Sequence, residues 1–201
     1  IKNWSISNTN NAGGEANEAK LGWSPQFNGI SRLVAAPINL TNVQSLIVKF
    51  DHYLDNYADG FSTIGIATSS DGGTSWNIGW SCEYNEEIKY SIEQRIATSD
   101  MGKDNVLICI YFEGVSARFQ AWYFDNIVVA VQPDTEIRLN SIDIYERIGS
   151  GPLDVKFSVQ NMGNDDIQSL VASYELEGYE TVTEAFSTSI ESFGTATFSF
   201  T

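Results

Sequence analysis

The residue whose chemistry stands out is Asp125, a carboxylate in the middle of an aromatic and aliphatic stretch. Residues 121–129 read Ala-Trp-Tyr-Phe-Asp-Asn-Ile-Val-Val, and this composition predicts a strand. A carboxylate among apolar side chains is costly unless it is paired, hydrogen-bonded or bound to a metal. Two interpretations follow: Asp125 is a ligand for a hard cation such as calcium, or it accepts hydrogen bonds from a neighbouring loop.

Catalytic side chains are scarce in this sequence. His52 is its single histidine and falls on the inward register of an alternating strand, where a core role is the more frequent one. There is no Gly-x-Ser-x-Gly nucleophile elbow, and one histidine with two separated cysteines does not make a zinc site. We therefore predict that the chain is not an enzyme. Cys82 and Cys109 have two open interpretations, one disulfide or two buried thiols.

A second kind of chemistry comes from the aromatic residues in and after a hairpin signal. Asp71, Gly72 and Gly73 predict the turn, and Trp76, Trp80 and Tyr84 follow it. Exposed rings at such a place can stack on sugar faces, although packing in the core is the commoner fate of these side chains. The three aromatic residues are the predicted glycan contacts.

The charge of the chain limits its partners. It has 26 acidic and 11 basic residues, a net charge of −15. Nucleic acids and anionic membrane surfaces need clustered Lys and Arg, so neither is an expected partner. No apolar run approaches the roughly 20 residues that cross a bilayer, so membrane insertion is not expected either.

The elements that position these residues are predicted to be strands throughout. Alternating apolar residues mark strands near 45–54, 62–69, 88–92 and 106–112, before the stretch around Asp125. Residues 4–23 are rich in Asn and Gly and predict a loop with one weak turn of helix. Many short strands without a convincing helix predict an all-β sandwich or jelly roll.

A polar break with Pro133 separates a second predicted β domain, so we place the domains at 1–132 and 137–201. Strands are predicted around 142–144, 153–159, 171–176 and 195–200. The second segment is shorter than the roughly 100 residues of an immunoglobulin-like sandwich, so we expect a domain that is truncated or lacks its last strands.

Several short motifs recur in the order of a known family, and they are Trp4, Gly13-Gly14, 31–33 with 37–40, 50–53, 69–76 and 122–127. The chain resembles the MAM-like jelly-roll modules of bacterial surface proteins, including the choice-of-anchor and cleaved-adhesin types. Residues 137–201 are similar to the cell-adhesion-related (CARDB) Ig-like modules that follow such jelly rolls.

This resemblance implies a non-catalytic extracellular or cell-surface module for adhesion or for positioning neighbouring domains of the same polypeptide. Its partner would be an extracellular protein or a glycan. It also implies a structural calcium held by an early acidic residue, Glu18 or Glu15, together with Asp125, and with Asp51 nearby. The alternatives are a carbohydrate-binding module and an accessory domain of a secreted hydrolase.

Overall fold

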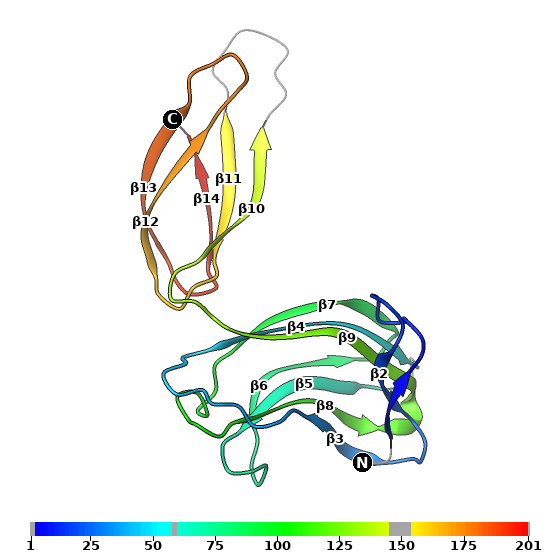
Figure 1. Ribbon diagram of the computed structural model, residues 1–201. Helices are drawn as coiled ribbons and strands as arrows, with labels where there is room; N and C mark the ends of the chain where they lie inside the picture. The colour runs from blue at the N-terminus through cyan, green and yellow to red at the C-terminus, as the bar shows by residue number, and fades with distance from the viewer. Residues whose placement is uncertain (1–2, 58–59, 145–153, 201) are drawn as a thin grey trace. The chain divides into compact units, whose positions relative to one another are not determined.

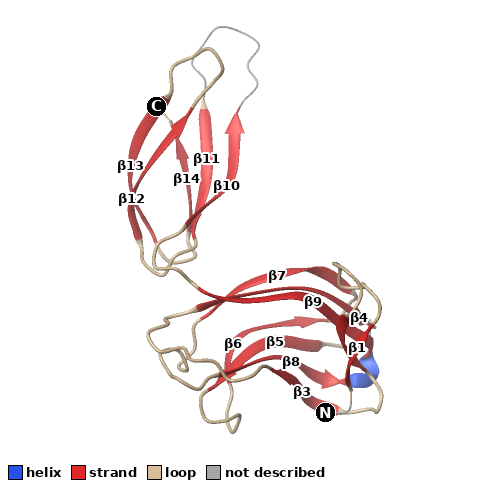
Figure 2. Cartoon of the chain, in the orientation of Figure 1, coloured by secondary structure: helices blue, strands red, loops and turns tan. Residues whose placement is uncertain are grey.

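The computed structural model describes residues 3–57, 60–144 and 154–200. The chain divides into two compact units, Ile1–Val131 (unit 1) and Gln132–Thr201 (unit 2). The all-β prediction is confirmed, because strands make up nearly all of the regular structure in both units (Figure 1). In the described part of the chain the one helical element is a single 3₁₀ turn, η1 (Ser116–Arg118) (Figure 2). No helix there is long and apolar enough to span a membrane.

Unit 1 is a sandwich of two antiparallel sheets that enclose one core. Sheet A has five strands in the order β1 (Trp4–Ser7), β2 (Glu18–Gly22), β9 (Phe119–Val131), β4 (Leu46–Asn56) and β7 (Ile88–Ile96). Sheet B has four strands in the order β3 (Asn28–Val34), β8 (Leu107–Val115), β5 (Ser62–Ser69) and β6 (Asn77–Tyr84). Figure 1 shows the two sheets as facing layers.

The period-2 pattern of β4 explains why this strand is at the centre of sheet A. Leu46, Val48, Phe50, His52 and Leu54 are buried, whereas Asp51 and Tyr53 point to the other face and are half-buried. The same alternation in β9 buries Trp122 and Phe124 and leaves Tyr123 and Asp125 on the outer face. The two strands pair in register from Asp51 opposite Asp125 to Leu54 opposite Trp122.

The N-terminal segment differs from its prediction. Residues 4–7 and 18–22 form strands β1 and β2, where the sequence predicts a loop with a weak helical turn. These strands are short and flanked by Asn and Gly, so local propensity does not reveal them. Their extended backbone is fixed by pairing: Leu21 lies opposite Trp122, and Trp4 lies opposite Leu21.

Unit 2 has a three-stranded and a two-stranded sheet. The first has the order β10 (Ile137–Ile144), β11 (Val155–Asn161) and β14 (Thr195–Ser199). The second pairs β12 (Ile167–Tyr174) with β13 (Val182–Ile190), a strand that the sequence analysis missed. Phe157, Val159 and Ile190 form the buried core between the sheets, with Phe186 and Phe198 packed against them.

Candidate functional site

A row of polar and aromatic side chains crosses the outer face of sheet A. Tyr53 on β4 lies directly opposite Tyr123 on β9, and Lys20 and Lys89 are the next residues of the row on β2 and β7. The two tyrosine rings stack with their centroids 6.0 Å apart and their planes 14° from parallel. The Lys20 ammonium lies 5.3 Å from the centroid of the Tyr123 ring, within the range of a cation–π interaction. We call these four residues the tyrosine face.

Carboxylates flank the tyrosine face on both sides. Partial burial and the nearby charges of Glu87 and Asp55 raise the pKa of Tyr53 to about 12, and its hydrogen bond with the Glu87 side chain adds to this shift. Tyr53 therefore keeps its proton at physiological pH. The pKa of Asp55 is raised as well, by burial and by the charge of Glu87. The face thus combines rings, ammonium groups, carboxylates and a neutral phenol, which can donate and accept hydrogen bonds.

The neighbouring row contains the predicted metal ligands. The Glu18 side chain is fully buried and accepts hydrogen bonds from Thr9 Oγ1 (2.6 Å), Asn11 N (2.8 Å) and Ala12 N (2.7 Å). These bonds fasten the loop between β1 and β2 over the edge of sheet A. Glu15, the alternative ligand, is exposed in that loop.

Asp51 and Asp125 lie opposite each other and are also satisfied by protein donors. Asp51 accepts hydrogen bonds from Ser91 Oγ and, at 2.7 Å, from Asn126 Nδ2; these bonds lower its pKa. Asp125 Oδ1 accepts a bond from Asn126 N at 2.8 Å. Gly14 approaches so closely that a Cβ there would lie 2.9 Å from Asp125 Oδ2.

Within the described ranges, no three His, Cys, Asp or Glu side chains come close enough together to hold a metal ion. Glu18, Asp51 and Asp125 therefore do not form a ligand set in this arrangement, and Asp125 accepts its hydrogen bond from the backbone of the next residue, Asn126, rather than from a neighbouring loop. Calcium binding stays a prediction, which melting curves in excess EDTA and in millimolar calcium can test.

The predicted glycan contacts do not share a face. Trp80 and Tyr84 pack against the core of unit 1, whereas Trp76 packs on the opposite face of sheet B, over Ala67, Cys109 and Tyr111. A bulge between Ile66 and Ala67 in the β5–β6 ladder causes this split, because an extra residue reverses which face the following side chains occupy. Rings on opposite faces of one sheet cannot contact the same ligand, so this arrangement does not support the three as a joint site.

Trp76 is moreover held by its own hairpin. Its Nε1 donates to Gly73 O at 3.1 Å, and the Arg32 guanidinium lies 5.1 Å from the centroid of the ring. The Trp76 ring therefore covers part of the outer face of sheet B.

His52 and Cys109, the histidine and one of the two cysteines, are buried. His52 is fully buried, and its Nδ1 accepts a hydrogen bond from Trp122 Nε1 at 3.3 Å. Both cysteines are free thiols, so the disulfide interpretation is wrong in this structure. Burial raises the pKa of Cys109 to about 11, which leaves almost no thiolate at neutral pH.

Sequence reasoning missed Tyr53 and Tyr123 as site residues. Both stand on the mixed faces of predicted strands, a signal that was available. Their stacking depends on the pairing of β4 with β9, which are far apart in the sequence, so only the register brings them together.

No protein-family model and no curated protein matches the sequence. Solved structures with a related arrangement include a family 16 carbohydrate-binding module (14% identity, 64% of this chain and 85% of that chain, TM-score 0.42). The xylan-binding domain CBM22-2 from Paenibacillus barcinonensis Xyn10C is similar over 65% of this chain and 92% of that chain (13% identity, TM-score 0.43). An exo-beta-agarase is similar over 65% of this chain and 22% of that chain (11% identity, TM-score 0.44). These scores are low, so the neighbours carry no argument about the site.

Proposed function

We propose that the chain is a non-catalytic glycan-binding module and that the tyrosine face of sheet A is its binding surface. The observation that carries the proposal is the stacked Tyr53–Tyr123 pair between two lysines, with carboxylates on either side. Sugar recognition combines apolar contact with ring carbons and hydrogen bonds with hydroxyl groups. A sheet surface supplies both along an extended ligand, so a polysaccharide chain fits it better than a small molecule.

A binding role without catalysis is supported by the side chains that could react. The single histidine is buried among aromatic rings, and the buried cysteine holds its proton. Asp51 keeps its charge through hydrogen bonds from Asn126 and Ser91, which suits an acceptor better than an acid. Release of new reducing ends from a bound glycan would contradict this part of the proposal.

The resemblance to surface modules supports an extracellular or cell-surface location. Adhesion and domain positioning are compatible with the same proposal, because a glycan-binding face on an exported protein is itself an adhesive surface. The net charge of −15 supports a neutral or cationic glycan over an acidic one, since an acidic polymer would be repelled.

A glycan screen followed by calorimetric titration tests the proposal. We expect replacement of both Tyr53 and Tyr123 by Ala to weaken binding of the best glycan about tenfold or more, because each ring contributes contact area and hydrogen bonds. Tyr179→Ala is the matched control, since Tyr179 is 76% exposed in unit 2. Binding that survives the double replacement unchanged would contradict the assignment of the face.

A further inference from the structure

Strand β10 of unit 2 exposes aliphatic side chains on the face that should be buried. Among the strands of residues 3–57, 60–144 and 154–200 it pairs with β11 alone and forms the edge of its sheet. Its apolar residues share the inner face with the buried Val155, Phe157 and Val159 of β11, yet each is 48–55% exposed. They are Ile137, Leu139, Ile142 and Ile144.

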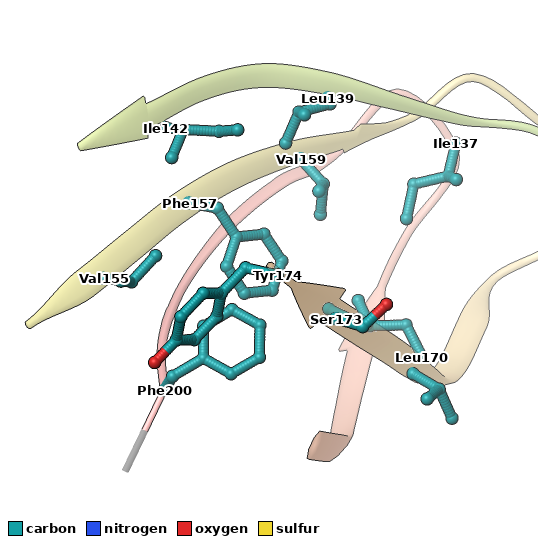
Figure 3. A pocket seen from close by; sticks show the side chains of 12 residues that line it. Ile137, Leu139, Ile142, Val155, Phe157, Val159, Leu170, Ser173, Tyr174 and Phe200 are labelled. Carbon is teal, nitrogen blue, oxygen red and sulfur yellow. The ribbon is translucent and has the colours of Figure 1, made fainter. Parts of the chain in front are cut away.

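Ile137, Leu139 and Ile142 form one wall of an open apolar groove of about 270 Å³. Leu139 and Ile142 face this groove from β10, and Leu170 and Tyr174 line it from β12 (Figure 3). The edge strand of a sheet presents a row of backbone N–H and C=O groups, so an edge strand beside an apolar groove is a site where another strand can pair.

The sequence of β10 is complementary to a second, antiparallel copy of itself. It reads Ile137-Arg-Leu-Asn-Ser-Ile-Asp-Ile144, so apolar, charged, apolar and polar positions mirror one another about the Asn140–Ser141 bond. The mirrored charged positions are Arg138 and Asp143, which have opposite signs. Mirrored residues also lie on the same face of the sheet, because the bulge between Leu139 and Ser141 puts Leu139 and Ile142 on the same side.

We propose that two copies of the chain associate by antiparallel pairing of β10 with β10 of the partner about a two-fold axis. In this register Arg138 lies opposite Asp143 of the second copy, Leu139 opposite Ile142, and Ile137 opposite Ile144. Opposite charges and aliphatic pairs directly across a strand pair are the favourable combinations. The two three-stranded sheets become one six-stranded sheet, and the exposed aliphatic residues gain apolar neighbours.

Charge complementarity is what selects a second copy as the occupant. Unit 2 is strongly acidic, with Arg138, Arg147 and Lys156 as its basic residues. Arg138 is the one that lies on the edge strand, and the two-fold axis places it opposite Asp143 of the second copy. β10 is therefore locally neutral, and screening at physiological ionic strength limits the repulsion between the two acidic chains to about 8 Å.

Sedimentation equilibrium of the full chain between about 10 µM and 1 mM tests the pairing, because a small edge interface gives affinities in this range. We expect a reversible dimer. Arg138→Asp and Asp143→Arg should each weaken it about tenfold or more, because like charges then face each other across the axis. An equimolar mixture of the two variants should form a heterodimer, in which every charged pair is again of opposite sign.

Asp165→Arg is the matched control for Asp143→Arg, since it makes the same charge change on an exposed loop of unit 2 and should leave the dimer intact. Thermal melts confirm that each variant is folded. A wild-type chain that stays monomeric at about 1 mM would overturn the proposal. So would a dimer that both single variants leave unchanged, or a mixture of variants that does not associate.

Discussion

At the residue scale, His52 shows how the core treats a group that could carry charge. Its ring is surrounded by Phe50, Tyr90 and Trp122, and the Tyr90 centroid lies only 4.7 Å away in an edge-to-face arrangement. Because Trp122 Nε1 can only donate, the bond to Nδ1 requires the neutral tautomer with its proton on Nε2. Nε2 has no hydrogen-bond partner among the described residues. The core therefore tolerates the neutral ring, whereas a charged ring would be buried without a partner.

This environment predicts a loss of stability in acid. Burial lowers the pKa of His52 from 6.5 to about 4, against a smaller opposing effect of Asp51. The unfolded chain therefore binds a proton that the folded chain refuses. Above pH 6.5 the free energy of unfolding is at its full value with respect to His52. It falls by about 3 kcal/mol as the pH drops from 6.5 toward 4.

Urea unfolding at pH 7 and at pH 4.5 measures this loss. Many carboxylates also titrate near the lower pH, so the comparison is with His52→Phe, which keeps an aromatic ring and cannot titrate. We expect the free energy of unfolding to decrease more between pH 7 and pH 4.5 for the wild type than for the variant. Equal slopes would show that His52 does not cause the acid sensitivity.

At the element scale, the loop between β1 and β2 depends on one carboxylate. Glu18 satisfies Thr9, Asn11 and Ala12 from a fully buried position, and Gly14, with φ +69°, lets the loop lie against Asp125. Few of the loop's residues are buried, so these bonds are its main attachment to sheet A.

We therefore expect Glu18→Gln to lower the free energy of unfolding by about 1–3 kcal/mol, because an amide cannot accept all of these bonds and brings a donor into the same space. The loss should be equal in excess EDTA and in millimolar calcium, measured by thermal or urea unfolding. A loss seen only in calcium would contradict the hydrogen-bonding account and make Glu18 a metal ligand.

The elements also show what the sequence can reveal. The alternation of β4 predicts a strand close to its observed bounds, because one face is core and the other is half-buried; β5 is buried on nearly its whole length, and its bounds follow from the turn signals on either side of it. β13 was missed because its Thr, Glu and Ser residues weaken the alternation, and it is a strand because β12 pairs with it. The site depended on non-local register, which placed Tyr53 beside Tyr123 and turned Trp76 away from Trp80.

At the scale of the whole molecule, each unit carries a different surface. Unit 1 presents the tyrosine face, and unit 2 presents the uncovered edge strand β10. A dimer formed through β10 would carry two tyrosine faces, so a glycan that reaches both would bind more tightly than one face alone permits. The proposed dimer would therefore bind such a glycan with higher avidity than a single chain, although neither proposal requires the other.

The most direct test of the central claim is a nuclear magnetic resonance titration of the labelled chain with the best glycan from a screen. The account predicts that the largest chemical-shift changes fall on Lys20, Tyr53, Lys89 and Tyr123 and on their neighbours in sheet A. Changes confined to sheet B around Trp76, or to unit 2, would contradict it and move the binding surface away from the tyrosine face.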